Sequence, residues 1–330
     1  MVLRIHFTAE DLVRTRVAAT ADPLWEVLLS GFRLHDRDAP LEYRPWLRQI
    51  QARQHTRQPR SRAGAHLLSV LAPLGSYIPD FLTPDDARHG IDAGLEAIRA
   101  TPRARLRREM LRLADRSPLP DWIRPLAEGD KAFLAWFTDE LRRYHDSVIT
   151  PCQDLVQGSI DADQARRARD LLHDGVEGLF EGLRPAMRWL PPVLEVDYAV
   201  DQDLHLRGRG LRLVPSFFSR GNPDSLADPD LSPVLVYPLD METRWATITS
   251  VRARGSLAAL VGATRAAVLH AVDPGATTTA LAARLGTSPS SVSRHTTVLR
   301  NSGLIATHRH GTAVLHTLTP LGRGLLDQDG

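Results

Sequence analysis

Hydrophobic and polar residues repeat with two different periods along this chain of 330 residues. Between residue 23 and about residue 190 the apolar positions recur every 3.6 residues, which predicts helices interrupted by prolines. The clearest of these predicted helices cover 47–55, 84–100, 102–115, 127–150 and 161–183. Beyond residue 190 the apolar positions alternate, which predicts strands at 193–200, 203–208, 210–218 and 233–238. With a further strand at 2–7, we expect an α+β fold: a mainly helical domain with a small, mostly antiparallel sheet.

Turn signals separate the predicted strands. None of these turn segments matches a catalytic motif. The segment 219–233 is rich in Pro, Asp, Ser and Gly and predicts a surface loop. GRGLRL at 208–213 lacks the third glycine of a dinucleotide-binding loop and lies in a strand pattern, so it predicts a hairpin. The GxSxG, HExxH and P-loop patterns are missing from the sequence. We therefore expect neither an enzyme nor a bound cofactor.

Near the end of the chain, the pattern predicts two helices joined by a tight turn. An amphipathic helix at 257–272 comes first, and Thr277 or Thr278 then caps a helix whose Leu281 and Ala282 face inward. Ser288 caps the next helix and Pro289 occupies its first position, where the missing N–H costs nothing. A hairpin at 304–319 and a short helix from Pro320 complete a winged helix-turn-helix, an arrangement that lays a helix in the DNA major groove.

The second helix of the pair separates an inward from an outward face. Val292, Thr296 and Leu299 are spaced to face the core. The outward residues, together with those at the start of the preceding helix and at the hairpin tip, can donate or accept hydrogen bonds to bases and phosphates. These predicted DNA-binding residues are Thr279, Ser288, Ser290, Ser291, Ser293, Arg294, His295, Thr297, Arg309 and His310.

Charge and aromatic content divide the chain near residue 250. Residues 250–330 contain eight arginines and three aspartates, a net charge of +5, whereas the rest has 33 basic and 36 acidic residues. All 19 Phe, Trp and Tyr residues lie at or before Trp245. We therefore expect an effector or dimerisation domain at 1–250 and a DNA-binding domain at 251–330.

The remaining composition limits the compartment and the metal chemistry. No run of 18 apolar residues exists, and acidic residues occupy the place of a signal-peptide core, so we expect a cytoplasmic protein without a membrane partner. A single cysteine, Cys152, excludes an internal disulfide and any multi-cysteine metal site.

The segments SSVSRHTTVLRNSGLI (290–305) and HRHGTAVLHTLTPLG (308–322) resemble the winged helix-turn-helix of ArsR-type bacterial repressors. The resemblance covers roughly 255–326, and the extra N-terminal domain is similar to that of large actinobacterial members. It implies a dimeric repressor released from DNA by metals or small molecules, with Ser290, Ser291, Arg294 and His295 on the recognition helix and Arg309 on the wing. The sequence departs from this family in lacking the paired-cysteine metal box and in having Thr296 where leucine is usual.

Three other features have two interpretations each. The wing histidines 308, 310 and 316 can form a metal site or remain solvated near phosphate. The arginines between 103 and 116 can form a second phosphate-binding surface or a solvated helix face. Aromatic residues can line an effector pocket or fill the core, and our candidates for the pocket are Trp122, Trp136, Phe137 and Trp189.

The sequence therefore predicts a DNA-binding transcription regulator that recognises an inverted repeat in double-stranded DNA as a homodimer. Repression is the expected mode, with DNA affinity set by dimer geometry and by a small-molecule effector. Three alternatives remain: an enzyme with an appended winged helix, a regulator controlled by a protein partner, and a winged helix that serves only in protein docking.

Overall fold

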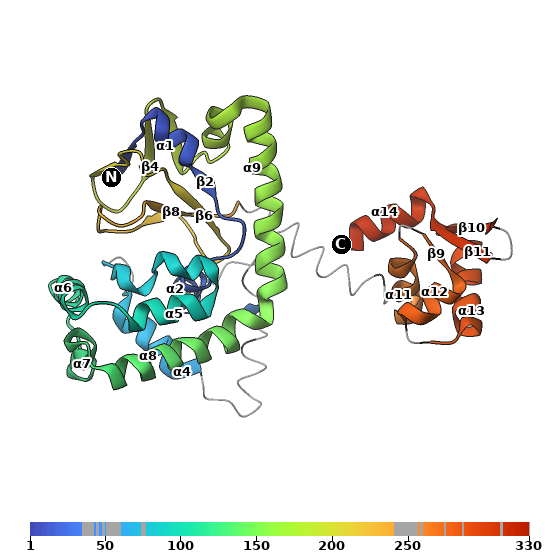
Figure 1. Ribbon diagram of the computed structural model, residues 1–330, viewed down its shortest axis with the longest axis horizontal. Helices are drawn as coiled ribbons and strands as arrows, with labels where there is room; N and C mark the ends of the chain where they lie inside the picture. Colours follow the sequence, from blue (N-terminus) through green and yellow to red (C-terminus); the bar gives the residue numbers. More distant parts are fainter. Residues whose placement is uncertain are drawn as a thin grey trace. The chain divides into compact units, whose positions relative to one another are not determined.

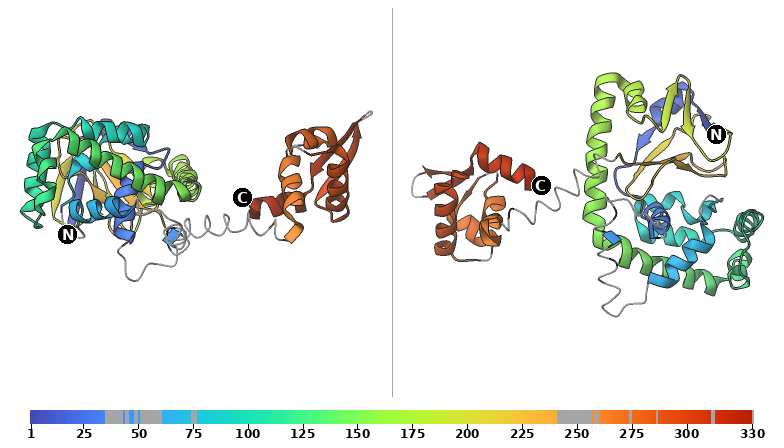
Figure 2. Two further views of the ribbon diagram at one scale, coloured as in Figure 1. Left: turned by 90° about the horizontal axis from the view of Figure 1, so that it is seen from below. Right: turned by 180° about the vertical axis from the view of Figure 1, so that it is seen from behind.

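The computed structural model describes residues 1–34, 43, 46–47, 50, 61–73, 77–240, 257, 260–273, 275–285, 287–310 and 313–329 (Figures 1 and 2). The chain forms two compact units, Met1–Arg244 and Trp245–Gly330. Helices and small sheets coexist in the same chain, so the predicted α+β class is confirmed. Within the described ranges, no helix is both long enough and apolar enough to cross a membrane.

Helices make up most of the N-terminal unit. They are α1 (Ala9–Arg14), α2 (Pro23–Leu34), α4 (Ser61–Leu71), α5 (Ile91–Arg99), α6 (Arg103–Ala114), α7 (Arg124–Glu128), α8 (Lys131–Tyr144) and α9 (Gln153–Glu181). Short turns of 3₁₀ or π helix link them: η2 (Asp80–Leu82), η3 (Asp85–His89), η4 (Asp121–Ile123), η5 (His145–Ile149) and η6 (Thr150–Cys152). The predicted helix at 47–55 lies mostly outside the described residues.

Glycines with positive φ divide three of the predicted helices. Gly90 (φ 112°) separates η3 from α5, and Gly129 (φ 68°) ends α7 before α8 begins. Inside α9, Gly175 (φ 65°) and the preceding Asp174 leave helical geometry. The single helices expected at 84–100, 127–150 and 161–183 are therefore each interrupted at a glycine. Glycine allows the interruption because it adopts positive φ angles that other residues rarely adopt.

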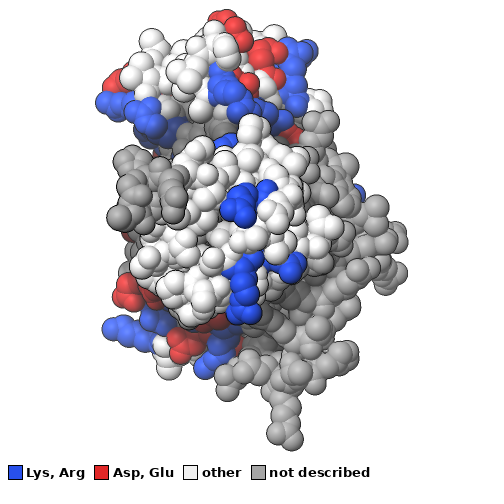
Figure 3. Space-filling view, turned by 90° about the vertical axis from the view of Figure 1, so that its right-hand side faces the viewer, with Lys and Arg blue, Asp and Glu red and all other residues white. Residues whose placement is uncertain are grey.

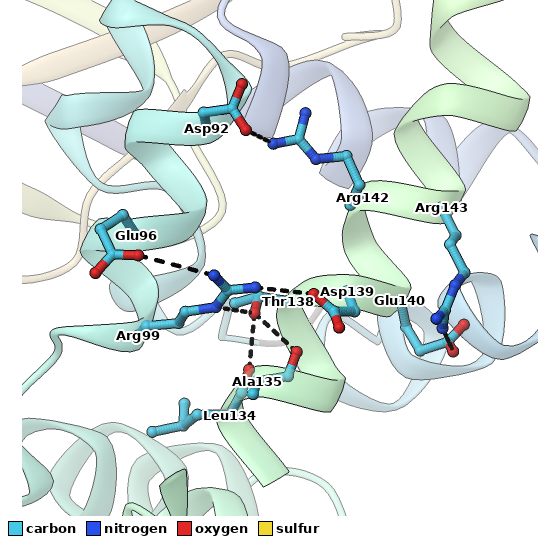
Figure 4. Close-up of polar contacts among 10 residues, drawn as sticks. All are labelled: Asp92, Glu96, Arg99, Leu134, Ala135, Thr138, Asp139, Glu140, Arg142 and Arg143. Carbon is cyan, nitrogen blue, oxygen red and sulfur yellow. Dashed lines mark hydrogen bonds and ion pairs between the residues drawn. The ribbon is translucent and has the colours of Figure 1, made fainter. Parts of the chain in front are cut away.

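Polar contacts link α5 and α8 where the two helices cross. Arg99 of α5 donates from Nε to Thr138 Oγ1 at 2.6 Å and from Nη2 to Asp139 Oδ1 at 2.8 Å (Figure 4). Arg142 of α8 pairs in the opposite direction with Asp92 of α5. Exposed pairs of this kind contribute little stability, so the buried apolar faces of the two helices hold the crossing together.

Two four-stranded sheets complete the N-terminal unit. Sheet A has the order β3-β4-β1-β5 and sheet B the order β2-β6-β8-β7. Their strands are β1 (Val2–His6), β2 (Arg16–Val17), β3 (Met187–Leu190), β4 (Val193–Asp197), β5 (Gln202–His205), β6 (Arg212–Ser216), β7 (Asp224–Ser225) and β8 (Val234–Pro238). Three pairings are parallel (β1 with β5, β2 with β6 and β6 with β8), so both sheets are mixed. The segment 208–213 connects strands of different sheets and is not a hairpin turn.

Sheet B lies between two hydrophobic cores and contributes to both. The helical core contains Val214 and Val236 among the buried residues of the helices, whereas Leu213 and Leu235 belong to the inter-sheet core shared with sheet A. Because successive side chains of a strand point to opposite faces, neighbouring residues enter different cores. In Figure 1, β6 and β8 lie above α2, and α9 runs along both layers.

The C-terminal unit has a core of its own. Its elements are α11 (Ala263–Val272), β9 (Ala276–Thr277), α12 (Thr278–Arg284), α13 (Pro289–Asn301), β10 (Ile305–His310), β11 (Ala313–Leu318) and α14 (Pro320–Asp329). The three strands pair in the order β10-β11-β9. The helix expected at 257–272 is interrupted, since α11 begins only after Gly262, whose φ is 88°. Leu269, Leu281, Val292 and Leu299 are almost fully buried in this core.

Candidate nucleic-acid interface

Helices α12 and α13 form the predicted helix-turn-helix, and a side-chain cap begins each of them. Thr277 Oγ1 accepts a hydrogen bond from Ala280 N, and Ser288 Oγ accepts one from Ser291 N, both at 3.2 Å. Pro289 occupies the first turn of α13 as predicted. Caps of this kind satisfy backbone N–H groups that have no partner within the helix, and they fix where α13 starts.

Three side chains anchor α13 to the core of the C-terminal unit. Val292, Thr296 and Leu299 are all buried, as their spacing predicted. The hydroxyl of Thr296 donates to the carbonyl oxygen of Ser293 at 3.1 Å. This internal hydrogen bond explains how a buried polar residue is accepted at a position where the resemblance suggests leucine, because a buried hydroxyl without a partner is costly.

The opposite face of α13 presents small polar side chains and arginine to solvent. Ser290, Ser293, Arg294 and Thr297 are exposed, and Ser291 is half-buried. Arg294 forms no ion pair with the described part of the chain, so its guanidinium group retains all its donors for a ligand. This face can reach into a groove and hydrogen-bond there without displacing any core contact.

Three of the predicted DNA-binding hydroxyls already have intramolecular partners. Thr297 Oγ1 donates to Ser293 O at 2.8 Å, and Ser288 Oγ lies 3.0 Å from Ser290 Oγ. Each oxygen can still accept a further hydrogen bond from a DNA donor. His295 is half-buried at the edge of the same face, and Thr279 is exposed on α12.

The wing is a β-hairpin formed by β10 and β11. Their register pairs Arg309 with Val314 and His310 with Ala313, which places both predicted wing residues at the tip end of the hairpin. The side chains of Arg309 and His310, and the whole of residues 311 and 312, lie outside the described part of the structure.

His316 is buried and contacts two other elements, so neither the metal-site nor the solvated interpretation of the wing histidines describes it. It is 4% exposed, with Nε2 3.0 Å from Thr278 Oγ1 on α12 and Nδ1 3.1 Å from Thr307 Oγ1 on β10. Burial, aided by the positive charge of Arg300, lowers the pKa of His316 below its usual range. The imidazole therefore joins the wing to the helix-turn-helix in its neutral form.

The wing histidines do not form a metal site among the described residues. His308 is exposed on β10, whereas both ring nitrogens of His316 face threonine hydroxyls. In the described part of the chain no three His, Cys, Asp or Glu side chains are arranged to hold a metal ion.

Arginine is the main charged residue in the described part of the C-terminal unit. Arg284 donates to Ala271 O and Arg323 pairs with Asp273, so these two are engaged locally. The face of this unit shown in Figure 3 is mainly uncharged, with arginines as separate blue areas.

The four aromatic residues predicted to line an effector pocket do not come together. Phe137 is fully buried in the helical core and Trp189 is 6% exposed in the inter-sheet core. Trp122 and Trp136 are about two-fifths exposed on the surface, at 39% and 40%. Trp136 and Phe137 are neighbours in α8, and residues one position apart on a helix point about 100° apart, so the two side chains do not share a face.

Helix α6 uses part of its arginine set within the N-terminal unit. Arg105 pairs with the buried Glu109 at 2.6 Å, and Arg108 pairs with Asp228 at 3.0 Å. Arg112 lies 4.4 Å from the ring centre of Tyr77. Leu111, on the same helix, is 56% exposed. The second phosphate-binding surface stays a prediction, with fewer free arginines to form it.

Part of the C-terminal unit matches a known family model. Residues 263–308 match a family model described as a helix-turn-helix domain. The C-terminal unit contains a helix-turn-helix. The matched residues run from the start of α11 to within β10 and include the whole of α13. Comparison with curated proteins finds no match, and comparison with solved structures finds none either.

Proposed function

We propose that this chain is a sequence-specific DNA-binding transcription regulator whose recognition helix is α13. The observation that carries the proposal is the division of α13 into a buried face, anchored by Val292 and Leu299, and an exposed face of serine, threonine and arginine. Hydroxyl and guanidinium groups on a helix of this kind suit the donor and acceptor pattern of the major groove. The helix-turn-helix match supports the same function.

The finer proposal is an ArsR-like repressor that binds an inverted repeat as a homodimer. Two recognition helices read successive major grooves only when they lie about 34 Å apart, so anything that changes the dimer geometry changes the DNA affinity. A small-molecule effector would act through unequal affinity for the geometries that can and cannot bind DNA. In this proposal the chain acts by binding and not by catalysis.

The first experiment measures DNA binding by the full chain. The upstream region of its own gene and random DNA of equal length are titrated in a gel-shift assay. We expect the upstream region to bind at least about a thousandfold more tightly, as specific sites do. Equal affinity for the two DNAs would overturn the proposed sequence specificity.

The second experiment tests whether α13 is the recognition helix. Arg294→Ala should weaken specific binding by about 1–3 kcal/mol if the guanidinium group reads a base. Arg265→Ala is the matched control, because Arg265 is also exposed in this unit but lies on α11 and donates to Val261 O. Equal losses in the two variants would indicate a general charge effect and contradict the assignment of α13.

A further inference from the structure

A cavity of about 180 Å³ lies within the N-terminal unit, where α2 and α6 meet the chain around β7. Three aromatic residues line it: Trp25 of α2, Tyr77 and Tyr198. Pockets that hold drug-sized molecules have volumes of roughly 300–1,000 Å³. The occupant of this cavity must therefore be smaller, and aromatic walls favour one with an apolar or cationic part.

Two polar groups that line the cavity have no hydrogen-bond partner. Thr83 is 4% exposed, and its Oγ1 bonds to no described residue. The carboxylate of Asp224, on β7, forms no ion pair and accepts no hydrogen bond within the described part of the chain. Burial raises the pKa of Asp224 to about 6, against an opposing effect of the Arg33 charge. Because buried polar groups almost always have partners, Thr83 marks a place for a hydrogen-bond donor, and the carboxylate of the partly buried Asp224 can accept from the same donor.

Two positively charged side chains line the same cavity. Arg112, on α6, and Arg116, two residues beyond the end of that helix, are exposed, and neither forms an ion pair with a carboxylate among residues that the structure describes. Arg112 is oriented by the ring of Tyr77, with its guanidinium carbon 4.4 Å from the ring centre. The cavity thus combines the Asp224 carboxylate, which accepts no hydrogen bond from the described residues and is affected only by the charge of Arg33, with two arginines that pair with no described carboxylate. A second lining carboxylate, that of Asp80, already accepts hydrogen bonds from Ala227 N and Asp228 N.

We propose that this cavity binds a small zwitterion of amino-acid size. Its ammonium group donates to Asp224 and to Thr83 Oγ1, its acid group accepts from Arg112 and Arg116, and its carbon chain contacts the aromatic rings. A simple amine would offer the two arginines no acid group to bind, and a simple acid would offer Asp224 and Thr83 no ammonium group as a hydrogen-bond donor. This proposal does not rest on DNA binding by the C-terminal unit.

The test is calorimetric titration of the full chain, at neutral pH, with each standard amino acid in turn. We expect at least one of them to bind. Its affinity should fall at least about tenfold in Asp224→Asn, because a hydrogen bond to a charged group is lost. Thr83→Val, which keeps the side-chain shape, should also weaken binding. Asp115→Asn is the control, since Asp115 is an exposed carboxylate at the end of α6 that does not line the cavity.

Thermal unfolding of the unliganded variants separates binding from folding. Asp224→Asn should unfold at a temperature close to that of the wild type, because the charge it removes is penalised by burial and this penalty is only partly offset by the Arg33 charge. Two results would overturn the proposal. One is that no amino acid binds, which would leave a cavity filled by water only. The other is that binding persists unchanged in both Asp224→Asn and Thr83→Val.

Discussion

His316 has a role that depends on its two threonine neighbours and not on its place in the wing sequence. It lies opposite Thr307 in the β10–β11 register and also contacts Thr278, which is 38 residues away in the chain. One ring nitrogen donates and the other accepts, because a neutral imidazole has one of each. Protonation would make both nitrogens donors within a buried site and next to the Arg300 charge.

The lowered pKa of His316 predicts a loss of stability in acid. The unfolded chain takes up the proton first, near the ordinary value of 6.5, so the free energy of unfolding falls as the pH decreases below that value. His316→Gln should remove this part of the pH dependence, as measured by the difference in thermal unfolding between variant and wild type across the pH range.

The control for this prediction is His308→Gln. His308 lies on the same hairpin with an exposed side chain, so the variant should keep the wild-type pH profile. Parallel profiles of His316→Gln and the wild type would contradict the buried, neutral imidazole.

Helix α9 shows how one residue position controls a whole element. Its first part contributes Val156 and Ile160 to the helical core, and its last part contributes Leu179 and Phe180 to the inter-sheet core. Gly175, with φ 65° and ψ −154°, makes the change of direction between the two parts. These angles are accessible almost only to glycine.

Gly175→Ala should therefore destabilise the N-terminal unit by about 1–3 kcal/mol through backbone strain alone. Apart from its neighbours in the chain and the backbone of its own helix, nothing lies within 4 Å of the position that a Cβ would occupy, so crowding plays no part. Gly324→Ala is the control, and its effect on the free energy of unfolding should have the opposite sign. Gly324 lies in helix α14 with equally open space around it, so alanine there should stabilise the C-terminal unit by about 0.5–1 kcal/mol. Chemical denaturation of both variants checks the pair, and a neutral Gly175→Ala would contradict the strain.

Local patterns were enough to predict the elements of the C-terminal unit. The Ser288 cap, the inward stripe of Val292, Thr296 and Leu299, and the hairpin all depend on residues close together in sequence. The sheets of the N-terminal unit were harder, because β6 pairs in parallel with both β2 and β8 across long connections. Period-2 alternation identifies a strand but carries no information about its partner.

The candidate interface was also predictable from residues close together in the sequence. The cavity of the N-terminal unit was not. The exposed residues of α13 follow from helix periodicity, with Arg294 on the outer face. Asp224, Thr83 and Tyr77 come from distant segments that only the fold brings to one cavity. Residue type was the only basis for predicting the four aromatic pocket residues. Type alone does not distinguish a tryptophan of the core from one that lines a pocket.

At the scale of the molecule, the two units have separate hydrophobic cores, and their stability should respond separately to mutation. Leu299 is 1% exposed in the C-terminal core, so Leu299→Ala should lower the free energy of unfolding of that unit by about 2–5 kcal/mol. Differential scanning calorimetry should show one transition moving to lower temperature while the other stays in place.

Val298→Ala is the matched control for this prediction. Val298 is the preceding residue of α13 and is 42% exposed, so its truncation should change stability by no more than about 0.5 kcal/mol. A single transition that shifts as a whole in Leu299→Ala would mean that the units unfold together.

Sheet B makes the N-terminal unit a single cooperative block despite its two cores. Leu213 and Val214 are adjacent in β6, yet one packs against sheet A and the other against the helices. Neither core can open without moving the strand that serves the other, since both faces of that strand are covered. Amide hydrogens of β6 and β8 should therefore exchange with solvent only through complete unfolding of this unit. The slowest amide hydrogens of the helices and of sheet A should exchange with the same free energy of opening.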